Sequence, residues 1–485
     1  MKMKIHTFFS LFIILMALTA CDHQDIQPPA PVLPVPSDSQ LAWHEMEMNA
    51  FVHFTTNTFT DKEWGYGDES PSVFNPTDFN ANQWVSALKE AGFKGLILTC
   101  KHHDGFCLWP SKYTEHSIKA SPYKNGKGDI VKEVSDACRT QGLKFGVYLS
   151  PWDRNHAHYG DPEYITYYRN QLKEIFTTYG PIFEMWFDGA NGGDGYYGGA
   201  NEKRTIDRQN YYDWPTTISL VKSMDSTTLF FSDAGPDIRW CGNEEGYIST
   251  TYWNTITPDT LYAGKSGITK LLNTGSPDGT KWIPAEVDVS IRLGWFYHAS
   301  EDSLVKNPQQ LFDIYLKSVG RGSLLLLNIP PDRRGLLHEN DLKSLRGFRA
   351  LLDKEFSKNL AQNASVTASS FRGNAQKFAA GNLTDNNKDS YWATNDSVKT
   401  ASIEVKLSAP HLVNYLLIQE YIKLGQRIEK FKIEALIKDK WKEVANGTTI
   451  GYKRILKIDP VETDRVRFTI EESKACPVIS NLEIY

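Results

Sequence analysis

Carboxylates placed where buried strands end are the residues of this sequence best suited to chemistry. Asp188 follows the apolar and aromatic run of residues 181–187 and precedes a cluster of glycines. A carboxylate beside Trp186 and Phe187 loses solvation, which a fold tolerates when the group has a partner or a task. Asp188 could instead cap the following loop through its backbone, as many Asp-Gly pairs do. This stretch alone leaves both interpretations open.

Glu244 is a second candidate. Two carboxyl groups that face each other across a pocket would suit glycosidic hydrolysis, which needs both. One attacks or steers water, and the other, as a carboxylic acid, protonates the leaving oxygen. Glu244 follows the apolar residues 240–241, which would raise its pKa, and Gly242 and Gly246 would let its loop fold inward. Glu244 could also be an ordinary solvated loop residue. Glu286, which is also expected to lie beyond a barrel strand, is the alternative acid/base.

Other catalytic chemistries find less support in the sequence. His102 and His103 are adjacent, and adjacent residues of a strand point to opposite faces, so both would rarely bind one ion. No His-x-x-x-His or paired cysteine motif accompanies them. The Gly-x-Ser-x-Gly motif of serine hydrolases is also missing from the sequence. We therefore expect no catalytic cofactor, and expect the histidines to hydrogen-bond substrate hydroxyls.

Short apolar strands alternate with amphipathic helices from residue 41 to about residue 356. Strands are expected at 50–54, 95–99, 145–149, 183–187, 228–231, 247–251, 323–328 and within 282–297; helices are expected at 82–91, 130–141, 163–179, 211–223 and 308–319. This alternation predicts an α/β fold with eight parallel strands, a TIM-like (β/α)₈ barrel. Polar and aromatic residues follow the expected strands, and the barrel would gather them on the face that holds the active site.

The remainder of the chain, residues 357–485, has a different pattern. Short alternating strands separated by turns predict an all-β sandwich. The full chain has 485 residues, 41% of them hydrophobic, and a formal net charge of −5. This length suits a large barrel plus a second domain, and the charge gives no basic footprint for nucleic acid. The 13 tryptophans would suit sugar recognition, although an aromatic-rich core would explain them equally well.

The N-terminus has the features of an export signal. Lys2 and Lys4 precede the apolar run 8–18, and Leu-Thr-Ala-Cys ends at Cys21, as in a bacterial lipoprotein box. We expect a signal peptide at 1–20, a lipidated Cys21, a Pro-rich tether at 21–40 and the catalytic barrel at 41–356. The protein would be an exported lipoprotein, in the periplasm or at the outer membrane or cell surface of a bacterium. An ordinary cleaved signal with a chance cysteine is the alternative.

Five stretches form a combination that is more specific than any one of them. They are residues 51–54 (Phe-Val-His-Phe), 101–106 (Lys-His-His-Asp-Gly-Phe), 186–189 (Trp-Phe-Asp-Gly), 239–244 (Arg-Trp-Cys-Gly-Asn-Glu) and 324–331 (Leu-Leu-Leu-Leu-Asn-Ile-Pro-Pro). Together they resemble the α-L-fucosidases of glycoside hydrolase family 29 over about residues 41–356. The resemblance implies that Asp188 is the nucleophile of a retaining double displacement and that Glu244 is the acid/base.

The resemblance also implies a substrate site. Residues matching family positions that hold the fucose hydroxyls are His53, His102, His103, Tyr148 and Trp186. The Gly-Asn-Glu motif at 242–244 resembles the subfamily that prefers α-1,3 and α-1,4 linkages. Fucose carries a methyl group at C5, so its site also needs an apolar patch. Trp64, Trp295 and Phe296 could supply it, although at least one of them is expected to serve packing.

The C-terminal part resembles a galactose-binding-like sandwich of the discoidin kind. Residues 381–385 (Gly-Asn-Leu-Thr-Asp) and 389–392 (Asp-Ser-Tyr-Trp) match a loop that in many such domains holds a structural calcium ion. Asp385 and Asp389 are compatible with calcium but fall short of a full ligand set. A plain Asx-turn loop is the alternative.

We therefore expect an exo-acting, retaining α-L-fucosidase that acts on fucosylated oligosaccharides or glycoconjugates. Its contact with the membrane would be through the lipid anchor alone. A barrel glycosidase for another deoxy or L-sugar is one alternative. A surface glycan-binding lipoprotein without catalysis is another, and its mark would be a neutral residue at Asp188, or at both Glu244 and Glu286. All three positions carry carboxylates.

Overall fold

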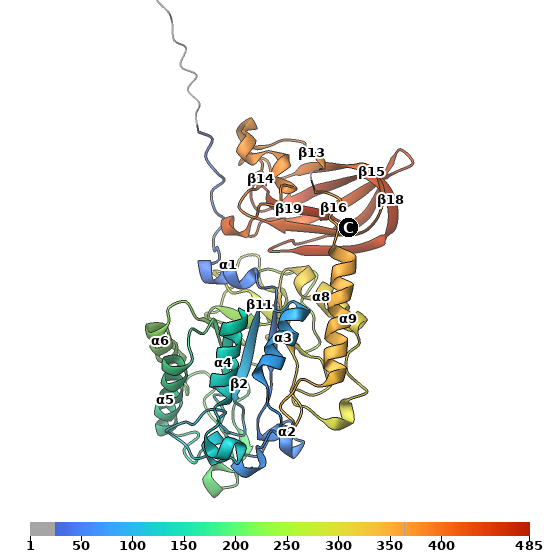
Figure 1. The fold of residues 1–485 in the computed structure, drawn as a ribbon. Coiled ribbons are helices and arrows are strands. Elements are labelled where there is room, and N and C mark those ends of the chain that lie inside the picture. The colour runs from blue at the N-terminus through green and yellow to red at the C-terminus, as the bar shows by residue number, and fades with distance from the viewer. Residues whose placement is uncertain (1–24, 363) are drawn as a thin grey trace, which may run out of the picture.

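The computed structural model describes residues 25–362 and 364–485 of the chain (Figure 1). Its first part is a closed barrel of parallel strands in the order β1-β12-β11-β8-β7-β4-β3-β2. The strands are β1 (Met48–Val52), β2 (Gly95–Lys101), β3 (Lys144–Leu149), β4 (Glu184–Trp186), β7 (Leu229–Ser232), β8 (Ile238–Trp240), β11 (Ala285–Ser290) and β12 (Leu324–Asn328). The prediction of a TIM-like barrel followed by a β-sandwich is confirmed.

The sequence misplaced one barrel strand. Residues 247–251 were expected to form it, but they lie in a loop, and β8 takes the place in the barrel. The chain passes from β7 to β8 through residues 233–237 without a helix. Strand β8 escaped the pattern because it is short and contains Arg239, a charged residue that is buried. Backbone carbonyls of Leu272 and Trp253 accept hydrogen bonds from its guanidinium group, which makes this burial tolerable.

Helices surround the barrel, and several of them begin and end at residues suited to capping. The longer ones are α3 (Ala81–Ala91), α4 (Ile130–Gln141), α5 (Pro162–Thr178), α6 (Trp214–Met224), α8 (Pro308–Lys317) and α9 (Glu339–Phe356); the shorter ones are α1 (Asp38–His44), α2 (Thr56–Thr60) and α7 (Thr269–Thr274). The side chains of Asn80 and Asp129 cap α3 and α4. Gly92 and Gly142 end these two helices in the left-handed conformation that glycine adopts without strain.

The barrel interior is filled rather than open. Every residue of β12 is buried, as expected for a parallel strand covered on both faces. An inner cluster of mainly aromatic side chains packs between the strands and includes Phe51, Tyr148 and Trp186. Trp43 of helix α1 also belongs to it, and its indole N–H donates to Glu184 over 3.0 Å. Helix α1 therefore closes the end of the barrel where the strands begin.

The second part is a β-sandwich dominated by long antiparallel strands. They are β13 (Ser365–Ala368), β14 (Trp392–Ala393), β15 (Ala401–Glu420), β16 (Ile428–Ile437), β17 (Lys440–Gly447), β18 (Arg454–Ser473) and β19 (Val478–Ile484). Buried and less buried residues alternate along the first half of β15, because one face of the sheet packs on the core. Two small ribbons accompany the barrel, β5 (Gly193–Gly195) with β6 (Glu202–Arg204) and β9 (Thr255–Ile256) with β10 (Lys281–Trp282).

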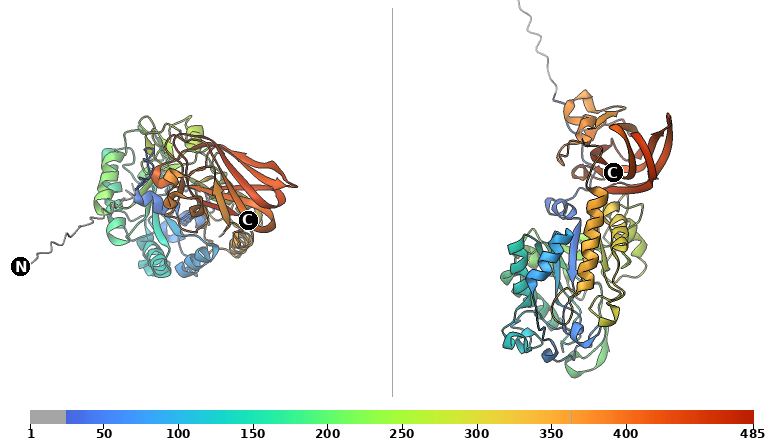
Figure 2. Two further views of the ribbon diagram at one scale, coloured as in Figure 1. Left: turned by 90° about the horizontal axis from the view of Figure 1, so that it is seen from above. Right: turned by 45° about the vertical axis from the view of Figure 1, so that its right-hand side comes forward.

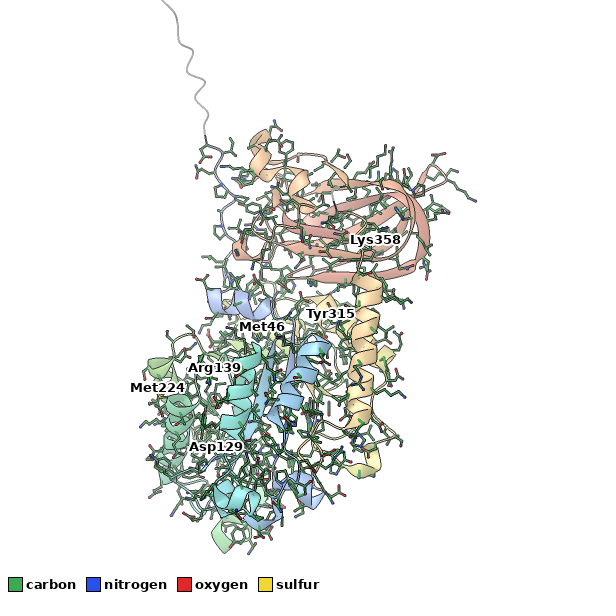
Figure 3. The ribbon with its side chains drawn as sticks, in the orientation of Figure 1. Met46, Asp129, Arg139, Met224, Tyr315 and Lys358 are labelled. Atoms are coloured by element: carbon green, nitrogen blue, oxygen red, sulfur yellow. The ribbon has the colours of Figure 1, made fainter. Side chains whose placement is uncertain are left out.

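The sandwich lies at the end of the barrel where the strands begin (Figures 1 and 2). Glu47, directly before β1, pairs with Lys453 of the sandwich. Gln426 is buried in the junction, where its side chain accepts from the backbone and side-chain amides of Asn254 at 3.0 Å each. Met46 and Tyr315 mark this end of the barrel in Figure 3. The opposite end, where the strands finish, remains free of the sandwich.

Residues 25–36, within the expected tether, lie against the sandwich. Arg427 donates to the carbonyl of Ala30, and the backbone N–H of Val32 donates to the carbonyl of Leu424. The expected signal peptide and Cys21 lie outside the described residues. Among the helices that the structure does describe, none combines the length and the apolar character needed to cross a bilayer.

Candidate active site

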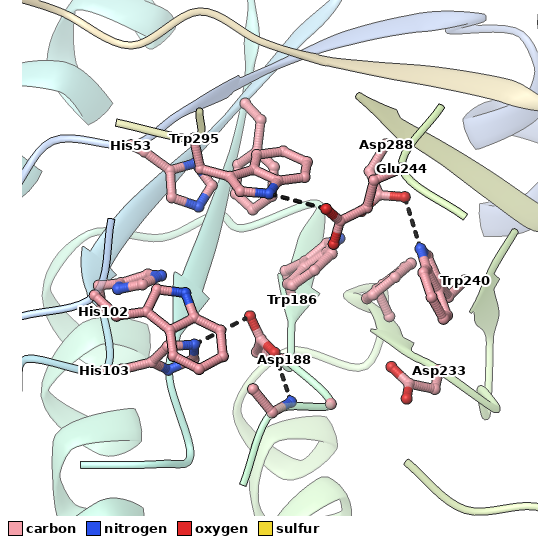
Figure 4. Close-up of a pocket in the computed structure, with 15 residues that line it drawn as sticks. His53, His102, His103, Trp186, Asp188, Asp233, Trp240, Glu244, Asp288 and Trp295 are labelled. Atoms are coloured by element: carbon pink, nitrogen blue, oxygen red, sulfur yellow. Dashed lines mark hydrogen bonds and ion pairs between the residues drawn. The ribbon is translucent and has the colours of Figure 1, made fainter. Parts of the chain in front are cut away.

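A cavity opens at the end of the barrel where the strands finish (Figure 4). Its volume is about 220 Å³, which suits one small polar ligand. The lining residues come from strands and loops spread along the barrel part of the chain: Phe51, His53, Trp64, His102, His103, Trp186, Asp188, Gly189, Ala190, Phe231, Asp233, Trp240, Glu244, Asp288 and Trp295. One wall is rich in histidine and the other in carboxylates.

Asp188 lies at the centre of this cavity, two residues beyond the end of β4. One carboxylate oxygen accepts from the hydroxyl of Tyr148 over 3.0 Å, and the other accepts from the backbone N–H of Ala190 over 2.7 Å. Burial raises its pKa, and these two hydrogen bonds oppose that rise. The bond to Ala190 is the loop cap that the sequence offered as an alternative role. The structure thus gives Asp188 a backbone partner and an open pocket at the same time.

His53 presents a hydrogen-bond acceptor to the cavity. Its Nδ1 lies 2.8 Å from Oδ1 of Asn328, whose amide N–H₂ donates to Ser290 and to the carbonyl of Trp295. Because Asn328 uses its donors there, Nδ1 of His53 must carry the proton. Burial lowers the pKa of His53 to about 3, so the ring is neutral. Its Nε2 is therefore free to accept a hydroxyl proton.

The same logic applies to His103. The hydroxyl of Ser150 donates to the carbonyl of Trp152, so it accepts from Nδ1 of His103 over 2.7 Å. Burial lowers the pKa of His103 to about 3. Its neutral Nε2 lies 3.8 Å from Oδ2 of Asp188, so this contact is not an ion pair. A ligand hydroxyl placed there can donate to Nε2 of His103 or to Asp188, but not to both at once.

The expectation that His102 and His103 point to opposite faces is wrong. Their ring centroids are 4.1 Å apart and both rings line the cavity. Strand β2 ends at Lys101, so the alternation that holds within a strand no longer applies to them. Within the part of the chain that the structure describes, Nδ1 of His102 is buried and has no hydrogen-bond partner.

Glu244 reaches the mouth of the cavity from the loop after β8. Gly242 and Gly246 both have φ of +84°, a conformation that glycine adopts readily, and they shape this loop. Oε2 of Glu244 accepts from Nε1 of Trp295 over 3.1 Å. Loss of solvation raises the pKa of Glu244, and the negative charge of Asp188 adds to the rise, against the Trp295 hydrogen bond. The expected neighbour Trp240 serves a different carboxyl group, Asp288.

Glu286 is placed differently from Glu244. It is fully buried in the barrel interior and does not line the cavity. One carboxyl oxygen accepts from Nε1 of Trp186 over 3.0 Å. Its other carboxyl oxygen is buried without a hydrogen-bond partner among the described residues, and the nearby carboxyl group of Glu184 raises its pKa further. The structure therefore brings Asp188 and Glu244 together at one cavity and keeps Glu286 beneath it.

The structure adds two carboxyl groups that the sequence interpretation did not assign to the site. Asp233 lines the cavity, accepts from the backbone N–H of Gly264 over 2.8 Å, and has its pKa raised to about 6 by burial. Asp288 also lines the cavity on the carboxylate side, and burial raises its pKa well above the usual range. Residues two apart in a strand share a face. If Glu286 had been predicted to point into the barrel, Asp288 would have been predicted to point the same way. For Asp233, the only indication in the sequence was that it follows an expected strand.

The aromatic candidates divide between the cavity and the packing around it. Trp64 lines the mouth and is 52% exposed, which leaves its ring accessible to a ligand. Trp295 lies over His53, with ring centroids 5.3 Å apart, and Trp186 forms part of the wall. Phe296 is buried and packs edge-on against His53 and His102 outside the lining. Trp64 and Trp295 thus keep the places expected of a sugar-binding patch.

The two carboxylates expected at a calcium site have protein partners. Asp385 accepts from the hydroxyl of Ser390 over 2.7 Å and from the backbone of Asn387, an Asx-type arrangement. Asp389 pairs with Lys423 over 2.6 Å. Within residues 25–362 and 364–485, the group geometrically able to hold a metal is the exposed set His158, Asp161 and Glu163. Calcium at Asp385 and Asp389 stays a prediction.

Comparison with known families divides the chain as the fold does. Residues 31–355 match the α-L-fucosidase family, and residues 365–483 match the F5/8 type C domain family. The alignment with α-L-fucosidase 1 of Arabidopsis thaliana shows 42% identity, covering 99% of this chain and 93% of the plant protein.

Solved structures give the same result. A glycoside hydrolase family 29 member from an unknown rumen bacterium has a TM-score of 0.84 and 43% identity, over 94% of this chain and 78% of that one. A family 29 fucosidase from Ruminococcus gnavus, solved in complex with fucose, has a TM-score of 0.85 and 35% identity. That match covers 95% of this chain and 96% of the other.

Proposed function

Because the chain belongs to glycoside hydrolase family 29 and is an α-L-fucosidase, we propose that it removes terminal fucose by a retaining double displacement. In this mechanism Asp188 attacks the anomeric carbon and forms a covalent fucosyl-enzyme, while Glu244 protonates the departing oxygen. Glu244 then takes a proton from water, which attacks the same carbon and frees Asp188. The single observation that carries the proposal is that both carboxylates line one cavity.

The state of each carboxyl group supports its proposed role. The hydrogen bonds from Tyr148 and Ala190 favour the ionised form of Asp188 that an attack requires. The raised pKa of Glu244 favours the protonated form that a general acid requires. When Asp188 becomes an ester, its negative charge is lost, so the pKa of Glu244 falls and the residue is prepared to act as a base.

The histidine wall supports recognition of an uncharged polyol. With Nδ1 of His53 and His103 committed to protein acceptors, their Nε2 atoms accept from hydroxyl groups. The low pKa values keep these rings neutral through the range in which the carboxyl groups titrate. The exposed ring of Trp64 offers an apolar surface at the mouth. Three hydroxyls and one methyl group, as in fucose, match such a mixed lining.

Covalent trapping tests the proposal. A 2-fluorinated fucosyl fluoride should label the wild-type chain once, and peptide mass spectrometry should locate the label on Asp188. Asp188→Asn should fold normally and lose at least about 10³-fold in kcat on a nitrophenyl fucoside. The matched control is Asp207→Asn, which changes a surface carboxylate and should keep wild-type rates. A label on Asp233, or an active Asp188→Asn variant, would remove the assignment.

We further propose a preference for α-1,3- and α-1,4-linked fucose, which rests on the Gly-Asn-Glu motif at residues 242–244. Fucosylated trisaccharides that differ only in linkage provide the test. The value of kcat/KM should be at least about tenfold higher for α-1,3 and α-1,4 than for α-1,2 and α-1,6 linkages. Equal values across the series would contradict the preference.

We propose that the protein is exported and anchored through Cys21, on the strength of the charged start, the apolar run and the Leu-Thr-Ala-Cys ending. Radiolabelled palmitate should label the full chain expressed in a bacterium. Cys21→Ala should lose the label and leave the membrane fraction. Label retained in that variant would contradict lipidation at this residue.

A further inference from the structure

Two carboxyl groups meet inside the barrel, away from solvent. Glu184 and Glu286 are both fully buried, and among the described residues no lysine, arginine or histidine forms an ion pair with either. Each accepts an indole N–H over 3.0 Å, Glu184 from Trp43 and Glu286 from Trp186. The two carboxyl groups interact with each other, and among the described residues the remaining oxygens, Oε1 of Glu184 and Oε2 of Glu286, are buried without a hydrogen-bond partner.

A shared proton explains this arrangement. Two ionised carboxylates in contact would repel each other in a medium that solvates neither. Burial raises the pKa of both Glu184 and Glu286 above the usual range of a carboxyl group. At neutral pH the pair therefore retains at least one proton, and a neutral acid can donate to its neighbour.

The pair is connected to the active site through Trp186. This ring stacks on Phe231, with centroids 4.1 Å apart and planes 6° from parallel, and also on Tyr148 at 5.3 Å. Tyr148 in turn donates its hydroxyl to Asp188. The indole N–H of Trp186 points at Glu286, which fixes the rotation of the ring. Hydrogen bonds and ring stacking thus connect Glu286 to Asp188 through Trp186 and Tyr148.

We propose that Glu184 and Glu286 form a proton-sharing pair of positioning residues that holds Trp186, and through it Tyr148 and Asp188, in the reactive arrangement. This inference rests on the proposed role of Asp188 and assigns Glu286 a role other than acid/base. Glu286 acts from below the cavity wall and does not touch the substrate. The pair matters because Trp186 forms part of that wall and Asp188 follows it by two residues.

Substitutions of Glu286 separate positioning from proton transfer. Glu286→Leu puts a slightly larger apolar side chain in place of the carboxyl group and leaves the indole N–H without an acceptor, which should lower kcat/KM by about 10- to 100-fold. The loss should be equal for aryl fucosides with good and poor leaving groups, and azide should not restore activity. Glu286→Gln still accepts from Trp186 and donates to Glu184, so its rates should stay within about threefold of wild type. Glu420→Gln, a buried carboxyl of the sandwich, controls for general destabilisation.

A double-mutant cycle tests the route through Trp186. Trp186→Phe removes the indole N–H, so adding Glu286→Leu to it should change kcat/KM by less than about twofold. Additive losses would overturn the proposal, as would a Glu286→Leu loss that grows with leaving-group pKa and recovers with azide. A Glu286→Leu variant with wild-type rates, or a Glu286→Gln variant as damaged as Glu286→Leu, would overturn it as well.

An infrared measurement gives a readout that does not depend on activity. The wild-type minus Glu286→Gln difference spectrum at pH 7 should contain the carbonyl stretch of a protonated carboxylic acid. Absence of that band would overturn proton sharing, even if Glu286→Leu fails to fold. Because this spectrum needs no turnover, failure of Asp188 labelling would leave the result intact and the two proposals distinguishable.

Discussion

The substitution Glu244→Gln isolates proton transfer from the rest of the site. The amide oxygen of glutamine can still accept from Nε1 of Trp295, now 3.1 Å from the carboxylate, so the loop keeps its contact. What the variant loses is the exchangeable proton and the base. General acid catalysis typically contributes about 10²–10⁴-fold, so hydrolysis of a fucosyl-oligosaccharide, with its poor leaving group, should slow by that factor.

The same variant should behave differently with a nitrophenyl fucoside. Nitrophenolate leaves without protonation, so formation of the fucosyl-enzyme should fall by less than about tenfold. Its hydrolysis lacks a base, so the intermediate should accumulate. Stopped-flow measurements should then show a burst of nitrophenolate equal to the enzyme concentration, followed by slow turnover. Azide, which needs no base, should accelerate that slow phase and yield fucosyl azide.

Glu245→Gln changes the neighbouring exposed carboxylate and should leave both substrates unaffected. Equal losses of Glu244→Gln on both substrates, without a burst or an azide effect, would refute the acid/base assignment. The acid would then have to be sought among the other carboxyl groups of the cavity, Asp233 and Asp288.

Three further outcomes are expected. Tyr148→Phe removes a hydrogen bond that lowers the pKa of Asp188, so the acid limb of the kcat/KM profile should move to higher pH; a move to lower pH would contradict it. Trp295→Phe removes the bond that lowers the pKa of Glu244, so the alkaline limb should also move to higher pH; an unchanged limb would contradict it. Gln426→Ala leaves the buried amides of Asn254 without their acceptor, so unfolding free energy should fall by about 2–4 kcal/mol in denaturant titrations, whereas kcat/KM should not change.

The fold could be predicted from the sequence wherever the spacing of apolar residues matches the residues that are buried in the structure. Strands such as β12 are continuous apolar runs, and helices such as α4 combine a buried face with an Asp129 cap and a terminal glycine. Such local signals predicted the barrel and the sandwich. Strand β8 was missed because Arg239 interrupts its apolar pattern, and only the carbonyls that surround it in space make its burial acceptable.

Part of the site could also be predicted from local sequence signals. Strand ends gather on one face of a barrel, so His53, His102, His103 and Asp188 could be grouped from their positions alone. The choice between Glu244 and Glu286 could not be made in this way, because both follow the pattern of a barrel loop or strand. Their difference lies in direction: the loop after β8 turns Glu244 to the mouth, and the pleat of β11 turns Glu286 into the interior.

The sequence by itself determined which residue types stand at the strand ends and hence the class of chemistry. Only the tertiary structure decided which ring nitrogens of the site histidines remain free to accept a hydrogen bond from a ligand. The neutral tautomers of His53 and His103 follow from Asn328 and Ser150, which lie 275 and 47 residues away along the chain. Protonation depends on solvation and on neighbours in space, which a linear order of residues does not fix.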